Sequence, residues 1–388
     1  MAITARRRRR KGLQWLIAAT CAALAVGAIA AAGAGAKGNS KPKFEIKHVF
    51  VVVLENENAD TSFGPASAAP YLSQTLRSRG AFLPNYYGIG HNSLDNYIAM
   101  ISGQAPNPTT QADCTTYTDF TPGIPTAGGQ FIGAGCVYPA STLTLPNLLE
   151  KRHLTWKGYM EDMANGPGQP TTCRHPAIGA PDTTVGARVG DQYATRHNPF
   201  VYFHSIIDKP TCARNVVDLT HLKGDLASKK RAPNFAFITP NVCHDGHDAP
   251  CVNGEPGGLV SANQWLTTNI PAILASKAYR DHGVLIVTFD EAKGGPSGDS
   301  SACCGELPGP NTALPGGVGP GGGRVGAVAI SKCIRPGTTD ATPYNHYSLL
   351  RSLEGFFGVR KLGFSAQSGL APIGNKTFTK RRACTSKK

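Results

Sequence analysis

The sequence predicts an α/β protein whose central, mostly parallel mixed sheet carries helices on both faces. Three observations favour this class. Short apolar runs alternate with segments of helical pattern, the runs are continuously apolar, and 388 residues can form one large α/β domain or two modest ones. Strands that are buried on both faces read as continuous apolar runs, which is typical of parallel sheets.

The first predicted strand covers residues 46–54, and a helix is expected over residues 69–79. Further along, residues 234–240 and 284–289 read as buried strands that flank a helical segment at residues 261–276. The strand and helix pattern then repeats in residues 324–331 and 346–359. This alternation is the main basis for the fold prediction.

Three long irregular stretches separate these elements, at residues 104–144, 166–198 and 294–323. Loops of that length in a compact domain are usually functional or disordered. The last stretch contains LPGGVGPGGGR, which lacks the spacing of a phosphate-binding P-loop. We interpret it as a flexible segment and an active-site flap.

The N-terminal residues have the pattern of a secretory signal. Six basic residues, Arg6 to Lys11, precede an apolar stretch and the small triplet Ala34-Gly35-Ala36. The expected organisation is a signal peptide at 1–36, a linker at 37–45, a catalytic domain at 46–365 and a basic tail at 366–388. Cleavage near Ala36 would leave a secreted, periplasmic or cell-envelope protein. The alternative is an uncleaved membrane anchor, because about 20 apolar residues can span a bilayer.

The formal charge of +14 arises partly from this leader, without which the chain is about +8. Basic residues of the tail are expected to be solvated, and no nucleic-acid partner is expected. Ten of the eleven cysteines follow the leader, and an even number in an exported chain indicates disulfides. No C-x-x-C pair supports a zinc site. The pairs Cys114 with Cys136 and Cys243 with Cys251 are candidates, although sequence alone leaves the connectivity open.

Acidic and amide side chains directly follow two of the apolar strands. Glu55 and Asn56 come after residues 51–54, and Asp290 and Glu291 come after residues 284–289. A carboxylate at the end of a buried strand is unfavourable unless something pairs with it, and sites in open α/β sheets form at the carboxyl ends of strands. We expect the two ends to meet at one divalent cation. Either pair alone could instead begin a turn or cap a helix.

A serine and several histidines complete the candidate chemistry. Ser93 lies two residues after His91 and before a helix-like run, so it is either a helix cap or a nucleophile activated by the cation. Each histidine alone is more typical of a structural role. Together they can bind an anion or protonate a leaving group, and the set comprises His91, His197, His244, His247 and His346.

Six motifs occur in an order known from one family: VVVLENEN, HNSLDNYIAMISG, RHNPFVYF, NVCHDGHD, TFDEAKGG and YNHYSLLRSLEGFFGV. In these motifs, spread over about residues 46–359, the chain resembles the bacterial phosphoesterase family of secreted acid phosphatases and phospholipase C-like enzymes. That family belongs to the alkaline phosphatase superfamily, whose fold is a central mixed sheet between helices. The cysteine-bearing loop 104–137 and the Cys303-Cys304 segment do not identify a substrate.

The resemblance implies a metal site and a nucleophile. Glu55, Asn56, Asp290 and Glu291 match the ligands of one divalent metal ion, either Ca, Mg, Mn or Zn. Ser93 matches the nucleophile, itself a metal ligand, which becomes a phosphoserine during turnover.

The resemblance also implies a phosphate pocket. His91, His197 and His244 match its histidines, with Asp245 orienting His244. His346 matches a family position whose role stays open, as does the role of His247.

The implied function is hydrolysis of phosphomonoesters by a secreted acid phosphatase. One alternative is a phospholipase C that cleaves phosphodiesters of phospholipids. The other is a secreted, metal-stabilised binding protein without catalysis. The expected partner is a phosphate ester or a phospholipid, with membrane contact only through the leader or a lipid substrate.

Overall fold

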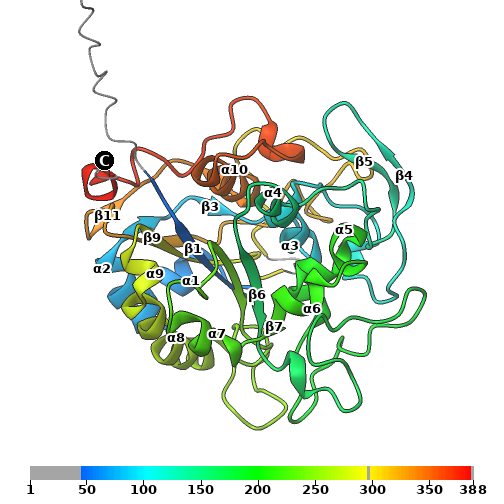
Figure 1. Ribbon diagram of the computed structural model, residues 1–388, viewed down its shortest axis with the longest axis horizontal. Helices are drawn as coiled ribbons and strands as arrows, with labels where there is room; N and C mark the ends of the chain where they lie inside the picture. Colours follow the sequence, from blue (N-terminus) through cyan, green and yellow to red (C-terminus); the bar gives the residue numbers. More distant parts are fainter. Residues whose placement is uncertain (1–44, 295–297, 386–388) are drawn as a thin grey trace, which may run out of the picture. The chain divides into compact units, whose positions relative to one another are not determined.

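The computed structural model describes residues 45–294 and 298–385 (Figure 1). The predicted signal peptide and nearly all of the linker therefore lie outside the described residues. The described part forms an eight-stranded sheet in the order β11-β2-β10-β9-β1-β8-β6-β7. Its strands are β1 (His48–Leu54), β2 (Ala81–Leu83), β6 (Trp156–Met160), β7 (Val216–Asp218), β8 (Phe235–Thr239), β9 (Gly283–Phe289), β10 (Ala327–Ile330) and β11 (Thr338–Thr339).

The predicted mixed, mostly parallel sheet is confirmed. Strand β1 pairs in parallel with both β8 and β9, β6 pairs in parallel with β7 and β8, and β11 pairs in parallel with β2. Only β10 runs antiparallel to its neighbours β2 and β9 in this sheet. Two small additional sheets pair β3 (Tyr86–Tyr87) with β12 (Tyr344–Asn345), and β4 (Thr121–Pro125) with β5 (Phe131–Ala134).

Strand β1 lies in the middle of the sheet because its sequence suits burial on both faces. All seven residues of HVFVVVL are buried, and β-branched valine packs well on a pleated surface. The neighbouring strand β9, GVLIVTF, is buried along its whole length as well. The carboxyl ends of β9, β1, β8 and β6 consequently lie side by side at one edge of the sheet.

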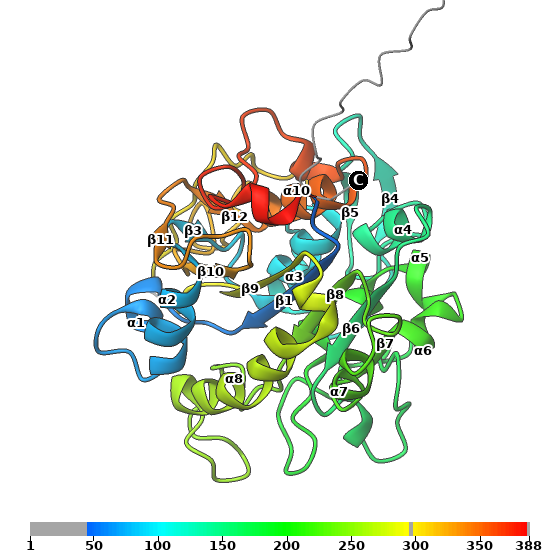
Figure 2. The same ribbon diagram turned by 60° about the vertical axis from the view of Figure 1, so that its left-hand side comes forward.

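Helices cover both faces of the sheet (Figures 1 and 2). On one side α3, α4 and α10 contact one another, and on the other α8 contacts α7 and α9. The α-helices are α1 (Ala59–Phe63), α2 (Arg77–Arg79), α3 (Ser93–Ser102), α4 (Leu145–Glu150), α5 (His204–Ile207), α6 (Thr211–Asn215), α7 (His221–Leu226), α8 (Gly258–Ala275), α9 (Lys277–Arg280) and α10 (His346–Phe357). Among the described residues, none of these helices has the length and apolar character needed to cross a bilayer.

Short single-turn helices complete the backbone. The π-helical turn η1 (Tyr71–Leu76) leads into α2, so the helix predicted over residues 69–79 is present but changes its hydrogen-bonding pattern. The 3₁₀ turns are η2 (Thr110–Ala112), η3 (Met163–Asn165), η4 (Thr195–His197), η5 (Pro199–Tyr202), η6 (Gly363–Ala366) and η7 (Arg381–Cys384).

All ten cysteines of the described chain form disulfides. The two expected pairs, Cys114–Cys136 and Cys243–Cys251, are present. The others are Cys173–Cys212, Cys303–Cys304 and Cys333–Cys384. The last disulfide connects the basic C-terminal segment to the loop after β10, and Phe378 in that segment is buried. Residues 366–385 therefore pack on the domain, although their basic side chains at positions 380–382 are exposed.

A buried carboxylate in α10 gives a pH-dependent prediction for stability. Glu354 is fully buried and accepts hydrogen bonds from the Leu362 amide at 2.7 Å and the Ser365 hydroxyl. Burial raises its pKa from 4.5 to about 7. Between these values the unfolded chain ionises while the folded chain keeps the proton, so the free energy of unfolding falls as pH rises from 4.5 to 7.

We expect Glu354→Gln to remove this contribution, which is at most about 3 kcal/mol. Denaturant unfolding at pH 4.5 and at pH 7 should show a smaller loss of stability in the variant than in the native protein. The control is Glu45→Gln, at a partly exposed residue. Equal losses in the native protein and Glu354→Gln would show that Glu354 is already ionised in the folded state.

Candidate active site

Acidic residues follow four neighbouring strands at the carboxyl edge of the sheet. Glu55 follows β1 and Asp290 follows β9, as the sequence predicted, while Glu161 follows β6 and Asp245 lies in the loop after β8. Glu55, Asp245 and Asp290 are fully buried. Such a concentration of buried carboxylates is unfavourable without protons or a cation.

Ser93 lies beside Glu55 at the start of α3. Its Oγ donates a hydrogen bond to Glu55 Oε2 at 2.8 Å, and the Tyr97 hydroxyl, one turn further along, donates to Glu55 Oε1. The N-cap of α3 is Asn92 and Ser93 is the first helical residue, so its hydroxyl is not used as a helix cap. The N-terminus of this ten-residue helix also favours a nearby anion.

His197 bridges two of the acids from the turn η4. Its Nε2 lies 3.4 Å from Glu55 Oε2, its Nδ1 lies 3.2 Å from Asp245 Oδ2, and its ring stacks on Tyr97 with centroids 5.4 Å apart. Asp245 was expected to orient His244, but the structure places its carboxylate against His197 instead. Glu55, His197 and Asp245 offer ligand atoms that all lie within 4.8 Å of one another.

The side-chain amide of Asn56 lies against the carboxylates of Asp290 and Glu55. With its nitrogen turned toward them, it donates to Asp290 Oδ1 at 3.2 Å and to Glu55 Oε2 at 3.0 Å. With its oxygen turned toward them, the same amide would be a further oxygen ligand for a cation. In addition, Asp290 Oδ2 is buried without a hydrogen-bond partner. The donor set of Glu55, Asn56 and Asp290 therefore fits a hard divalent cation.

Glu291 and His91 form a second group close to these residues. The amide of Glu291 donates to Asp290 Oδ1 at 2.6 Å, while its Oε2 lies 3.5 Å from Asn96 Nδ2 and 4.0 Å from His91 Nδ1. His91 Nε2 contacts the carbonyl of Asp299 at 2.9 Å, in the glycine-rich stretch. The stretch interpreted as an active-site flap thus contacts a candidate site histidine.

Burial and mutual repulsion shift the pKa values of these groups strongly. Burial, with the charges of Asp290 and Asp245, raises the pKa of Glu55 well above its ordinary value. Burial also raises the pKa of Asp245 to about 8 and that of Asp290 to about 6. The pKa of His197 is lowered well below its ordinary value by burial, so the ring is neutral near pH 7. Carboxylates that resist ionisation together are the expected apo state of a cation site.

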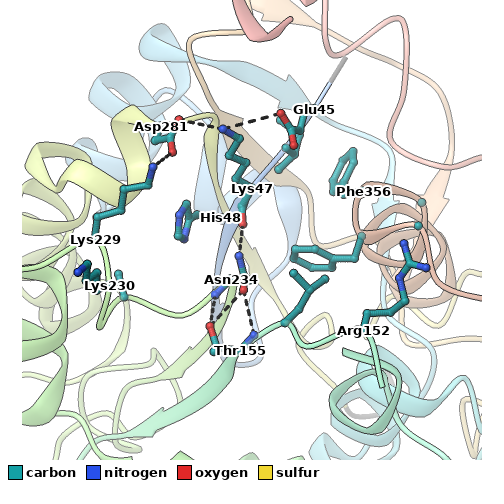
Figure 3. A pocket seen from close by; sticks show the side chains of 16 residues that line it. Glu45, Lys47, His48, Arg152, Thr155, Lys229, Lys230, Asn234, Asp281 and Phe356 are labelled. Atoms are coloured by element: carbon teal, nitrogen blue, oxygen red, sulfur yellow. Dashed lines mark hydrogen bonds and ion pairs between the residues drawn. The ribbon is translucent and has the colours of Figure 1, made fainter. Parts of the chain in front are cut away.

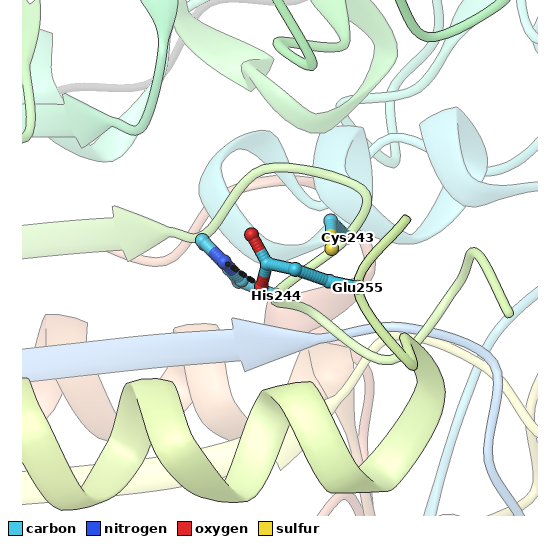
Figure 4. Close-up of side chains that lie close together, drawn as sticks. All are labelled: Cys243, His244 and Glu255. Atoms are coloured by element: carbon cyan, nitrogen blue, oxygen red, sulfur yellow. Dashed lines mark hydrogen bonds and ion pairs between the residues drawn. The ribbon is translucent and has the colours of Figure 1, made fainter. Parts of the chain in front are cut away.

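His244 contacts a different pair of acids, Glu161 and Glu255, and Figure 4 shows the second of them beside its ring. Its Nδ1 lies 3.0 Å from Glu161 and its Nε2 lies 3.2 Å from Glu255. Burial favours the neutral ring, but the hydrogen bonds and charges of Glu161 and Glu255 outweigh it and raise the pKa of His244 to about 9. Cys243 also lies nearby, but its sulfur is bonded to Cys251 and is not free to bind a metal.

His247, whose role the sequence left open, lies nearer the candidate site. Its ring centroid is 6.3 Å from that of His197, and Nδ1 contacts Asp248 Oδ1 at 2.7 Å. The hydrogen bond to Asp248 raises the pKa of His247. Gly246, with a φ of +114°, makes the turn between Asp245 and His247, and a Cβ there would lie 2.9 Å from the Glu55 carbonyl. Glycine therefore lets this loop approach β1.

His346 contacts the backbone of the candidate site and not its side chains. It is fully buried at the start of α10, where Nδ1 lies 3.1 Å from the Tyr86 hydroxyl and Nε2 contacts the carbonyl of Asp290. Burial lowers the pKa of His346 to about 4. The neutral ring holds the backbone of a candidate metal ligand.

A separate cavity of about 670 Å³ lies at the opposite edge of the sheet (Figure 3). Its lining includes residues that immediately precede strands β1, β6 and β8, namely Lys47, Thr155 and Asn234. Lys47 pairs with Asp281 at 3.4 Å inside it. The cavity shares no lining residue with the group around Ser93, so it is not the candidate active site.

The contrasting contacts of His197 and His244 predict contrasting variants. For the phosphomonoester reaction that the resemblance implies, Asp245→Asn should lower kcat by about 10²-fold if His197 transfers a proton, because the amide no longer orients that imidazole. His244→Gln should leave kcat nearly unchanged and reduce the free energy of unfolding by about 1 kcal/mol, through the lost pairs with Glu161 and Glu255. Steady-state kinetics and denaturant unfolding of both variants provide the measurement. A large loss of kcat in His244→Gln, with Asp245→Asn fully active, would reverse the assignment.

Sequence comparisons relate this chain to known proteins. A sequence model of the Phosphoesterase family matches residues 65–360. The phosphate-repressible acid phosphatase of Penicillium chrysogenum is 28% identical over 310 residues, which are 80% of this chain and 58% of that protein. The phosphatidylinositol-3-phosphatase of Mycobacterium tuberculosis is 24% identical over 353 residues, which are 91% of this chain and 89% of that protein.

One solved structure in the comparison is a protein in the alkaline phosphatase superfamily from Vibrio parahaemolyticus. It has a TM-score of 0.46 and 15% identity over 81% of this chain and 67% of that chain. The chain spans less than two thirds of the length of the Penicillium acid phosphatase. The match of the family model to residues 65–360, most of the sequence, shows that this chain belongs to the Phosphoesterase family.

Proposed function

We propose that the chain is a secreted, metal-dependent phosphoesterase that hydrolyses phosphomonoesters through a phosphoserine intermediate at Ser93. The observation that carries this proposal is the hydroxyl of Ser93, which lies at the N-terminus of α3 and 2.8 Å from a fully buried carboxylate, Glu55. A serine held beside a divalent-cation site is a typical phosphoryl acceptor. Family membership and the names of the acid phosphatase relatives favour the same reaction.

Glu55, Asn56 and Asp290 would hold the cation, with Ser93 and Glu291 completing the set. When bound, the cation would lower the pKa of the serine hydroxyl and stabilise negative charge on the phosphoryl oxygens. All other steps use side chains of this chain. The identity of the ion, Ca, Mg, Mn or Zn, is for metal analysis to decide.

Ser93 loses its hydroxyl proton to solvent, Oγ attacks phosphorus in line with the ester oxygen, and the bond from phosphorus to the alcohol oxygen breaks. Because the α3 N-terminus is directed at this point, its amide groups favour the charge that accumulates on the phosphoryl group. Water then cleaves the phosphoserine and releases inorganic phosphate. The neutral ring of His197, oriented by Asp245 at 3.2 Å, is placed to take a proton from that water.

Protonation of the leaving alcohol needs a second group. His247 fits this role because Asp248 occupies its Nδ1 at 2.7 Å, while the side chain remains about one-third exposed. The ring can therefore reach a bound substrate while staying near His197. We assign the role to His247 in preference to His244, whose two nitrogens contact Glu161 and Glu255.

The substrate is either a soluble phosphomonoester or one carried by a lipid. The relative from Mycobacterium tuberculosis, matched over 89% of its length, is named as a phosphatidylinositol-3-phosphatase, and this favours a lipid phosphomonoester as the second candidate. A phospholipase C would instead release diacylglycerol from a phosphodiester. Secretion agrees with the five disulfides, which form in oxidising compartments.

Product analysis of three substrates tests the proposal. The purified protein, supplied in turn with each candidate divalent metal, is incubated with 4-nitrophenyl phosphate, phosphatidylinositol 3-phosphate and phosphatidylcholine. We expect inorganic phosphate from one or both monoesters. Release of diacylglycerol from phosphatidylcholine would show that the chain is a phospholipase C and not a phosphomonoesterase. If metal-bound protein gave no product from any substrate, the chain would be the non-catalytic binding protein.

A further inference from the structure

Arg196 is a buried cation for which the reaction described above has no role. It lies in the turn η4, immediately before His197, and its side chain is only 8% exposed. Burying a guanidinium is unfavourable unless its donors are used, so a buried arginine beside a reaction centre needs a partner.

The protein itself satisfies Arg196 poorly. Its Nη1 donates to the Val185 carbonyl at 3.4 Å, and its Nε lies 4.0 Å from Asp113 Oδ2, which is beyond hydrogen-bond distance. None of its nitrogens is among the fully buried polar atoms without a partner, so the remaining N–H groups face space that solvent can enter. The guanidinium is thus fixed in place with donors left for another molecule.

Arg174, in the same long loop, is a buried arginine whose guanidinium has a full hydrogen-bonding partner. Its Nη1 and Nη2 donate to the two carboxylate oxygens of Asp191 at 2.8 Å and 2.7 Å. Both arginines are buried, yet only Arg174 has a bidentate carboxylate partner. The planar fork of Arg196 is therefore free to bind two oxygens of a ligand.

Asp113 lies between Arg196 and the start of α3. Asp113 Oδ1 accepts a hydrogen bond at 3.0 Å from the amide of Leu94, the residue after Ser93, while its other oxygen faces Arg196. Arg196 also directly precedes His197 in the turn η4. The guanidinium is therefore held beside the residues that surround Ser93.

The net charge of the candidate site indicates which class of ligand Arg196 would bind. Glu55, Asp245, Asp290 and Glu291 are all buried there, so one divalent cation does not outweigh them when they ionise. A phosphomonoester carries up to two negative charges and a diester carries one, so residual negative potential disfavours the monoester more. The positive charge of the Arg196 guanidinium, with its two donors on one side, offsets this greater repulsion of the monoester.

We propose that Arg196 binds two nonbridging phosphoryl oxygens and thereby makes the site selective for phosphomonoesters over phosphodiesters. The inference rests on the proposed phosphoesterase function and names the substrate class of that site. A monoester shares up to two negative charges over three nonbridging oxygens, whereas a diester shares one charge over two. The diester therefore gains less from the same guanidinium.

The test compares 4-nitrophenyl phosphate with methyl 4-nitrophenyl phosphate. Arg196→Gln should lower kcat/KM for the monoester by about 10²-fold and for the diester by less than about fivefold. Arg196→Lys, which keeps the charge without the fork, should fall between the native protein and the glutamine variant for the monoester. Equal losses for both esters, or none, would overturn the inference.

Arg174→Gln is the matched control, because it removes another buried arginine of the same loop. It should lower the melting temperature while leaving the monoester-to-diester ratio unchanged. A changed ratio in this variant as well would mean that loop disorder, and not the guanidinium of Arg196, sets the preference.

Calorimetric binding of inorganic phosphate and dimethyl phosphate separates the inference from the proposed function. On metal-loaded native protein and Arg196→Gln, we expect the variant to lose at least about tenfold in affinity for inorganic phosphate and little for dimethyl phosphate. A chain that hydrolysed neither ester, but showed this binding difference, would disprove the enzyme and keep the arginine site. Unchanged phosphate binding in the variant would overturn the role of Arg196 whatever the chain catalyses.

Discussion

Ser93→Ala is expected to reduce turnover of 4-nitrophenyl phosphate by about 10³-fold or more. The variant removes the protein atom that the proposed reaction joins to phosphorus, the Oγ that donates to Glu55. It should still fold, since alanine suits the first turn of a helix and adds no bulk in a buried position. Steady-state kinetics with circular dichroism and a melting curve provide the measurement.

The matched control is Ser102→Ala, at the other end of the same helix. Ser102 is also buried, and its hydroxyl donates to the Ile98 carbonyl at 2.7 Å, a bond inside α3. This variant should keep near-native kcat. A comparable loss in both variants would point to damage of the helix and not to loss of a nucleophile.

Trapping the intermediate distinguishes Ser93 from His197 as the phosphoryl acceptor. His197 Nε2 lies 3.4 Å from the carboxylate oxygen that Ser93 contacts, so both side chains are near the same point. Rapid acid quench preserves a phosphoserine and destroys a phosphohistidine, and peptide mass spectrometry locates the group. Label on the His197 peptide, or full turnover by Ser93→Ala, would remove Ser93 from its role.

The sequence was most informative where a physical conflict was visible in it. An apolar run that ends in Glu55 places a charge at the edge of a core, and the same conflict recurs at Asp290. The parallel pairing of β1 with β9, Leu54 opposite Phe289, brings both conflicts to one place. Buried strands and the acids that end them could be predicted because each needs only a few neighbouring residues to be recognised.

Side-chain direction across loops could not be predicted in the same way. Asp245 and His244 are adjacent in sequence, yet Asp245 contacts His197 while His244 contacts Glu161 and Glu255. The positive φ of Gly246 turns this loop, and nothing in a residue pattern tells which acid then faces which ring. Arg196 was not among the predicted site residues, because the role proposed for it depends on hydrogen bonds that it does not make within the protein.

Very short strands were also missed, for a simpler reason. Strands β2 and β7 have three residues each and β11 has two, too few for any periodicity to appear. They form because the neighbouring strands already present a hydrogen-bonding edge. Tertiary context, and not local sequence, specifies them.

Removing a proposed cation ligand is the second change with a large expected effect. Its effect on the free energy of unfolding has opposite signs in the metal-free and the metal-bound protein. Glu55→Gln should stabilise or leave unchanged the metal-free protein, because it removes one of several mutually repelling buried carboxyl groups. The same change should abolish stabilisation by added divalent metal, which amounts to about 2.7 kcal/mol at a hundredfold excess over the dissociation constant in the native protein. Turnover should fall with the metal, and chelation of the native enzyme should have the same effect.

Thermal unfolding with and without each metal, together with elemental analysis, measures both signs. Glu57→Gln, two residues further along and only partly buried, is the control and should keep the metal-induced shift. Asp290→Asn should behave like Glu55→Gln, because its Oδ2 is one of the buried oxygens without a hydrogen bond. If Glu55→Gln lowered the stability of the metal-free protein and left the metal-induced shift intact, the carboxylates would be structural, and the awkward end of β1 would need another explanation. A cation site requires the reverse: Glu55→Gln leaves the metal-free protein as stable or more stable and removes the stabilisation by metal. The reason is that the ligands are held together for an ion that only the folded chain can bind.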